Sequence, residues 1–153
     1  MRDAPTGLRS ALALAAGTVK SRPMRKILIL ALALLSIDAR AEWTEIQKFD
    51  DGMRVFVDKA SARRSGETAQ VTHLVRWGEP QLEPDSQAYR STVVRTRYDC
   101  VAKRERYLAS TSYAGTMGDG AKIIEDDDEA EAWYSISEAS MEDKLWKIAC
   151  AAK

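Results

Sequence analysis

Six basic side chains within 17 positions carry the clearest binding potential in the sequence. Arginine presents a planar fork of N–H donors that matches carboxylate and sulfate groups. Residues two apart on a strand share a face, so Arg95 and Arg97 would project together, and Arg106 would join them if the next strand folds back. We therefore expect a surface for an acidic protein segment or a glycosaminoglycan, formed by Arg90, Arg95, Arg97, Lys103, Arg104 and Arg106. The alternative is ordinary charge on an exposed sheet face, partly neutralised by the acidic run 125–129.

The remaining reactive residue types do not form a catalytic or metal-binding pattern. His73 is the one histidine and has no second ligand at metal-binding spacing, so we interpret it as a satisfied or half-buried core residue. No G-x-S-x-G motif occurs. The sequence therefore predicts a protein that is not an enzyme, with no catalytic residues, no cofactor and no metal.

Two loops resemble ligand-binding motifs without matching them. Residues 115–120 are rich in glycine but lack the Gly-Lys-Ser/Thr ending of a phosphate-binding loop, so we expect a tight turn with positive φ angles. The acidic run 125–129 lacks the alternating spacing of an EF-hand, so we expect a solvated loop rather than a calcium site.

The strands that must position the arginines are indicated by period-2 alternation of apolar and polar residues. In the segment from Gln70 to Trp77, for example, Val71, His73 and Val75 share one face. The pattern predicts an antiparallel meander with strands at Trp43–Ile46, Arg54–Asp58, Gln70–Trp77, Tyr89–Cys100, Arg104–Tyr113 and Ala132–Ile136.

The C-terminal segment changes to a helical period. Ser140 followed by Asp143 is typical of a helix start, and Met141, Leu145 and Ile148 then fall on one face. The fold class is therefore α+β, with one antiparallel sheet and a C-terminal helix packed on one face.

Two cysteines, Cys100 and Cys150, are the only ones in the chain. An even, minimal pair in an exported protein indicates one disulfide, which would pin the helix to the sheet. Two buried thiols, or a bond between chains, are the alternatives.

An export signal precedes this domain. Met24-Arg25-Lys26, an apolar run from Ile27 to Ile37 and the triplet Ala39-Arg40-Ala41 follow the order of a secretory signal peptide. We assign residues 24–41 to the signal and 42–153 to one domain; residues 1–23 are an over-extended start or a long n-region. We expect export to the periplasm or the cell surface, with no membrane span in the mature chain.

Charge narrows the class of partner. The whole chain carries 23 basic and 23 acidic residues, of which residues 1–41 hold seven and two, so the domain has a net charge of about −5. A mildly acidic domain argues against nucleic acid as the partner. A sheet with a free edge leaves a homodimer open.

Several short motifs, in order along residues 41–150, match one family. They are Ala41-Glu42-Trp43, Val55-Phe56-Val57-Asp58 with Ser61, Tyr89-Arg90-Ser91, Tyr98-Asp99-Cys100, Tyr113, Gly115, Met117-Gly118 and Gly120, and Leu145-Trp146-Lys147-Ile148-Ala149-Cys150.

With these motifs the chain resembles the surface-adhesin protein E family of Gram-negative bacteria. The resemblance implies a sheet of about six strands and a C-terminal helix tethered by a Cys100–Cys150 bond. It also implies a binding module whose partners are proteins, such as the host matrix proteins vitronectin or laminin. A periplasmic envelope accessory protein without a host ligand is the alternative function.

Overall fold

The computed structural model of this protein describes residues 41–153. The expected signal peptide and the stretch before it lie outside the described residues, apart from Ala41.

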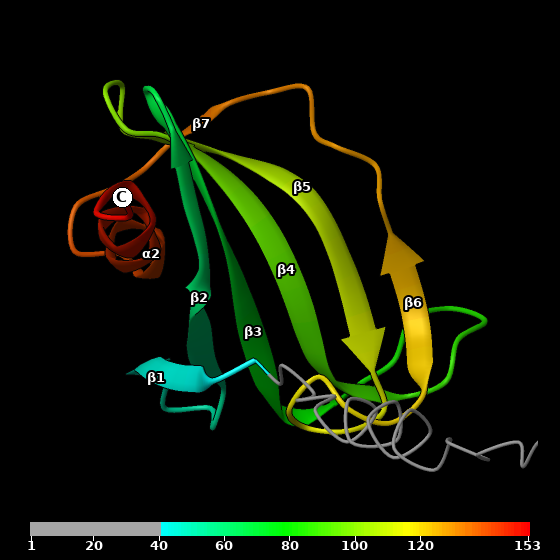
Figure 1. Cartoon of the computed structure of the whole chain (residues 1–153). Coiled ribbons are helices and arrows are strands. Elements are labelled where there is room, and N and C mark those ends of the chain that lie inside the picture. Colours follow the sequence, from blue (N-terminus) through cyan, green and yellow to red (C-terminus); the bar gives the residue numbers. More distant parts are fainter. Residues whose placement is uncertain (1–40) are drawn as a thin grey trace, which may run out of the picture. The chain divides into compact units, whose positions relative to one another are not determined.

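One antiparallel sheet forms the body of the domain, as the sequence predicts, and it has seven strands where about six were expected. Strands β1 to β6 lie in sequence order, and the short β7 pairs with β5 beside β6. Figure 1 shows these strands side by side, with the helix α2 next to β2. The elements are β1 Trp43–Lys48, β2 Arg54–Ser65, β3 Thr68–Gln81, β4 Tyr89–Asp99, β5 Arg104–Tyr113, β6 Lys122–Asp126, β7 Tyr134–Ser135 and α2 Met141–Cys150.

Alternation along the strands gives the sheet two different faces. On the helix face, Val57, Val71 and Tyr98 are buried against Leu145 and Ala149 of α2. The other face carries the residues between them on each strand, including Arg95 and Arg97, and we call it the arginine face. Because the two faces alternate residue by residue, the register of each strand decides which side chains meet.

The start of α2 is fixed by a cap and by charge. The Ser140 hydroxyl accepts a hydrogen bond from the Asp143 amide at 3.1 Å, as the sequence predicts. The buried Asp143 carboxylate accepts from Lys147 at 2.7 Å and pairs with Lys103 at 3.0 Å. These two ammonium groups, that of Lys147 first, lower the pKa of Asp143 to about 2.

The end of α2 is tied to the sheet by the Cys100–Cys150 disulfide, which confirms the expected pairing. Its Cα atoms lie 5.7 Å apart, and the bond closes a sequence separation of 50 residues. In the chain-entropy model such a loop contributes roughly 4 kcal/mol of stability. The Trp146 indole also donates to the Asp99 carbonyl at 3.1 Å, so the C-terminal half of the helix is tied to the end of β4 by two contacts.

Two strands extend beyond the sequence prediction. β2 continues past Asp58 to Ser65, and β3 begins at Thr68, so the hairpin turns at Gly66 with φ of +60°. The segment 59–64 has no apolar alternation, which is why the pattern ended at Asp58. β6 was not among the expected strands, and Trp133 lies on the arginine face beside Arg106.

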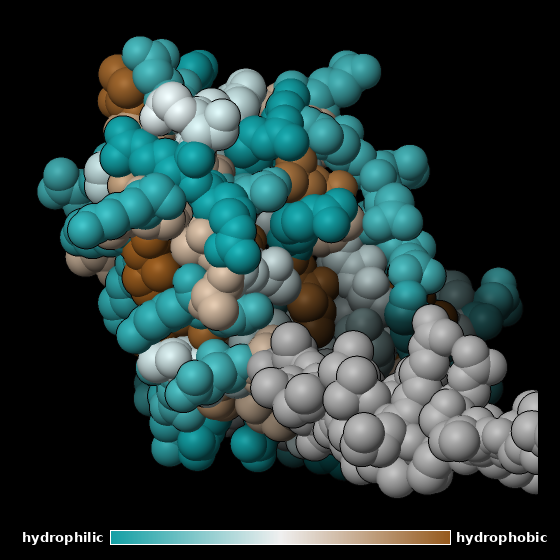
Figure 2. All heavy atoms as spheres, viewed as in Figure 1, coloured by the Kyte–Doolittle hydropathy of each residue, from teal (hydrophilic) through white to brown (hydrophobic). Residues whose placement is uncertain are grey.

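Within residues 41–153, no helix has the length and apolar content needed to span a bilayer. Figure 2 shows a mainly hydrophilic surface on the side it displays, with small hydrophobic patches between the polar side chains.

Candidate binding surface

A row of arginines crosses four strands of the arginine face. Arg63 of β2 lies opposite Gln70 of β3, Gln70 lies opposite Arg97 of β4, and Arg97 lies opposite Arg106 of β5. Residues directly opposite in an antiparallel ladder have Cβ atoms about 5 Å apart on the same face. We call Arg63, Arg97 and Arg106 the arginine row.

Arg95 adds a fourth guanidinium close to the row. It lies two residues before Arg97 on the same face of β4, opposite Thr72 and Ala109, and it is exposed. The sequence therefore predicted correctly that Arg95, Arg97 and Arg106 share one face.

Like charges on opposite residues destabilise a sheet, and one carboxylate offsets them here. Glu129 accepts a hydrogen bond from Arg97 at 3.2 Å and forms an ion pair with Arg106. The Arg106 guanidinium also lies 5.0 Å from the centre of the Trp133 ring. One residue of the acidic run thus positions two arginines.

The opposite end of the row has no such compensation. Arg63 donates to the carbonyls of Ala60 and Ala62 at 2.5 and 2.8 Å. Among residues 41–153, no carboxylate lies within 4.0 Å of Arg63 or Arg95. The row with Arg95 therefore holds four guanidinium groups against the single charge of Glu129.

A pocket of about 250 Å³ opens between Arg63 and Arg97. The other residues that line it also belong to the β2–β3 hairpin: Arg64, Ser65, Thr68, Ala69 and Gln70. Two forks of N–H donors facing one pocket can bind a carboxylate or a sulfate in a bidentate way. The pocket is therefore suited to an acidic group of a partner.

Three of the predicted basic residues lie apart from this row or are already paired. Lys103 binds Asp143 of α2 and lies over the Trp146 ring, so it holds the helix. Arg104 pairs with Asp99 at 2.8 Å; the Ala102 amide and this guanidinium lower the pKa of the Asp99 carboxyl. Arg90 is exposed at the start of β4, next to Ser91. Alternation along the strand places it on the opposite face from Arg95 and Arg97.

Sequence reasoning missed Arg63, the arginine nearest the open pocket. The expected turn at Ser65-Gly66-Glu67 was the available signal, because a two-residue hairpin turn needs strands directly on both sides of it. Extending the strand from Asp58 to this turn would have placed Arg63 on the sheet.

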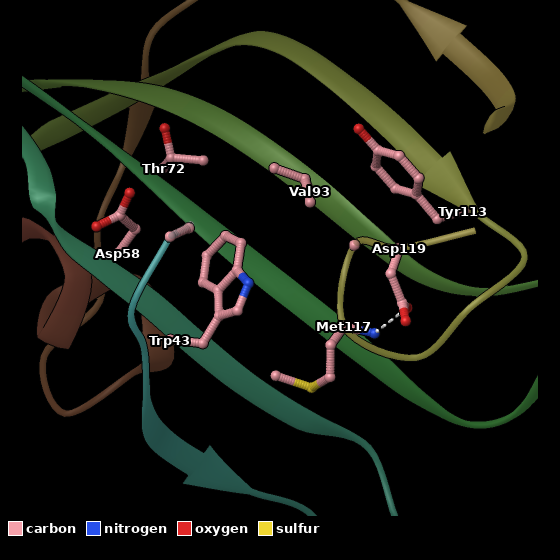
Figure 3. Close-up of a pocket in the computed structure, with 9 residues that line it drawn as sticks. Trp43, Asp58, Thr72, Val93, Tyr113, Met117 and Asp119 are labelled. Atoms are coloured by element: carbon pink, nitrogen blue, oxygen red, sulfur yellow. Dashed lines mark hydrogen bonds between the residues drawn. The ribbon is translucent and has the colours of Figure 1, made fainter. Parts of the chain in front are cut away.

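A second, larger pocket of about 620 Å³ lies beside the row on the same face. Figure 3 shows the Trp43 ring near its middle, between Asp58 on one side and Tyr113 on the other. The glycine-rich loop forms one wall, where the Met117 amide donates to Asp119 at 3.1 Å. Gly118 has φ of +71° and a Cβ there would lie 3.0 Å from Val93, so the expected positive-φ turn is confirmed.

His73 differs from the expectation of a satisfied or half-buried residue. Its exposed fraction is 7%, and its Nδ1 atom has no hydrogen-bond partner among the described residues. Burial lowers the pKa of His73 to about 4, so the ring is neutral at pH 7.

Residues 43–151 match the model of one protein family, described as surface-adhesin protein E. The chain belongs to this family. A comparison of the sequence with curated proteins gives no match.

Solved structures of Haemophilus influenzae protein E share this fold. One aligns with a TM-score of 0.58 at 14% identity, covering 74% of this chain and 87% of the other. Its crystal form II gives a TM-score of 0.57 at 13% identity, covering 74% and 91%. Protein E from non-typeable H. influenzae gives 0.55 at 14% identity, covering 75% and 79%. At such identities the likeness concerns the fold alone.

Proposed function

We propose that this protein is an exported, non-catalytic binding domain that holds an acidic segment of a partner protein on its arginine row. The observation that carries the proposal is the pocket between Arg63 and Arg97, which is lined by three arginines, Arg63, Arg64 and Arg97, and by no carboxylate. Membership of the surface-adhesin family supports a protein as the partner.

The partners proposed for this surface are host extracellular-matrix proteins such as vitronectin or laminin. An acidic stretch of such a protein would lie across β2 to β5, with one carboxylate between Arg63 and Arg97. Arg95 is exposed beside the row and would bind a second carboxylate. Because most of this surface faces solvent, binding should weaken as salt increases without being abolished at physiological ionic strength.

Charge reversal on the row tests the proposal. The purified, disulfide-bonded protein is applied to immobilised vitronectin, laminin and heparin at low and at physiological salt. We expect saturable binding to a matrix protein, and about tenfold weaker binding by the Arg63→Glu/Arg97→Glu variant, because charge-assisted hydrogen bonds are lost. Arg90→Glu is the matched control, since Arg90 is an exposed arginine outside the row.

Two results would contradict the proposal. Equal binding by the double variant would place the contact elsewhere on the domain. Binding to none of the probes, together with release of the protein only by periplasmic lysis and not by protease treatment of intact cells, would favour a periplasmic accessory role.

A further inference from the structure

A third pocket lies between α2 and the sheet, on the face opposite the arginine row. Its volume is about 220 Å³, several times the ~30 Å³ that one water occupies in the liquid. Residues of five elements line it: His73, Val94, Thr96, Glu105, Tyr107, Tyr134, Met141, Glu142 and Leu145. We call it the helix-side pocket.

The pocket contains an unsatisfied hydrogen-bonding group. His73 lines it, is almost fully buried, and leaves Nδ1 without a partner among the described residues. A buried polar atom of this kind is unfavourable unless something pairs with it. The neutral imidazole has one nitrogen that accepts a hydrogen bond, so a donor from a ligand would satisfy it.

The pocket also holds negative charge that nothing nearby balances. Glu105 of β5 and Glu142 of α2 both line it, and no Lys or Arg of residues 41–153 lies within 4.0 Å of either carboxylate. Two lysines at α2, Lys103 and Lys147, are paired with Asp143. Two carboxylates facing one small cavity attract a cation.

Titration of these groups is coupled. Burial first, and the charge of Glu142 second, raise the pKa of Glu105 to about 7. The other titratable groups that face the pocket are His73, Glu142, Tyr107 and Tyr134, with the buried Tyr98 paired to Glu105 in the ladder. Burial also raises the pKa of Tyr98 and of Tyr107, so the phenols stay neutral near pH 7.

The remaining walls suit an organic cation with an alkyl chain. Tyr107 and Tyr134 contribute aromatic rings, whose faces attract ammonium groups. Val94, Met141 and Leu145 add an apolar lining for methylene groups. The described residues contain no cluster of three metal-binding side chains, so a metal ion is the poorer fit.

The directions of the acceptors favour ammonium over guanidinium. Glu105, Glu142 and His73 line the pocket from β5, α2 and β3, so acceptor groups reach it from three different elements. An ammonium group has three donors that point in different directions, whereas guanidinium presents a planar fork to one carboxylate.

We propose that the helix-side pocket binds a primary alkylammonium group, either a lysine side chain of a partner protein or a small free amine. The ammonium donates to the Glu105 and Glu142 carboxylates and to the acceptor nitrogen that the His73 ring presents to the pocket, and the methylene groups attached to the ammonium pack on Leu145. This goes beyond the proposed function, because the site lies on the other face and takes the opposite charge.

A titration of the untagged, isotopically labelled protein by nuclear magnetic resonance tests this proposal. The probe is Nα-acetyl-lysine methylamide, whose only charge is its ammonium group, added at pH 8. We expect saturable shifts of the His73 ring, which gives the one histidine signal of the chain, and of the Tyr134 ring. The Nε-acetylated probe should produce no saturable shift. At pH 6 binding should be weaker, since Glu105 is then protonated.

Variants localise the effect. Glu105→Gln should weaken binding about tenfold, the loss expected for one charged hydrogen bond. Glu79→Gln, an exposed carboxylate of β3 outside the pocket, should leave binding unchanged. Glu142→Gln gives an independent readout if Glu105→Gln does not fold.

Cadaverine distinguishes the sources of the ammonium group. Tighter binding of blocked lysine than of cadaverine indicates a protein lysine, and the reverse indicates a free amine; both support the pocket. Absence of saturable shifts at His73 and Tyr134, or equal affinity in the glutamate variants, would overturn the proposal. Neither result bears on the arginine row, which is assayed with other probes.

Discussion

The two faces of the sheet carry opposite charges in different surroundings. On the arginine face, Arg63 and Arg95 face solvent, and Glu129 balances Arg97 and Arg106. On the helix face, Glu105 of β5 and Glu142 of α2 line one pocket, and no Lys or Arg of residues 41–153 lies within 4.0 Å of either carboxylate.

The difference shows how burial changes what a charge does. Exposed guanidinium groups keep their charge at little cost, because water and salt screen them. A carboxyl group placed against a helix loses hydration, and the pKa of Glu105 rises to about 7 in consequence. The first face is therefore suited to an exposed acidic partner, and the second responds to pH and to a small cation.

Removing the disulfide should have the largest effect, and it should act on the helix face. We expect the Cys100→Ser/Cys150→Ser variant to lose about 2–5 kcal/mol of unfolding free energy, because the unfolded chain regains the freedom of a long loop. Urea unfolding with and without reductant measures the loss. The variant itself should not respond to reductant, and an unchanged midpoint in the reduced wild type would contradict the tether.

The pH dependence of stability should separate two groups of the helix face, the buried His73 and the half-buried Glu105. The folded pKa of His73 is lowered from 6.5 to about 4, so its contribution is lost as pH falls through this range. Protonation of His73 should therefore lower the unfolding free energy by about 3 kcal/mol near pH 4. Glu105 acts in the opposite sense, since its raised pKa adds stability as pH falls from about 7.

Because the two effects oppose each other in the wild type, the pH profiles of the unfolding free energy should differ clearly between the two single variants. In Glu105→Gln, the unfolding free energy should fall steeply between pH 6.5 and 4; in His73→Leu, it should rise over part of that range. Parallel pH profiles for the two variants, measured by urea unfolding, would contradict the assignment of these opposite effects.

The smallest effect concerns the arginine face. Glu129→Gln should change stability by only about 0–1 kcal/mol, as is typical of exposed ion pairs. The same change frees Arg97 and Arg106, so binding of an acidic partner should strengthen severalfold. Glu131→Gln, another exposed acid of the same loop, is the control. Weaker binding by Glu129→Gln would show that Glu129 aids recognition instead of competing with the partner.

The sequence predicts local features well in this domain. Alternation around Val93 and Thr96 identifies β4, and Ser140 marks the start of α2. The two cysteines predict the disulfide that joins the helix to the sheet. The strand and the helix start depend on residues that are close together in the chain. The disulfide is predictable because two cysteines can form only one intrachain bond.

The features that sequence reasoning missed depend on distant contacts. Arg63 lies in a stretch without apolar alternation, so only its pairing with β3 places it on the sheet. Glu129 meets Arg97 across 32 positions. His73, Glu105 and Glu142 converge only because α2 returns to the sheet, and their types and spacing contain no sign of it.

Recognition of an acidic partner by the arginine row can be followed through arginine side-chain signals during titration with a glutamate-rich peptide at physiological salt. We expect saturable shifts of the guanidinium signals of Arg63, Arg95, Arg97 and Arg106, while the His73 ring signal does not move. Shifts confined to other residues, or no saturable shift at all, would contradict it.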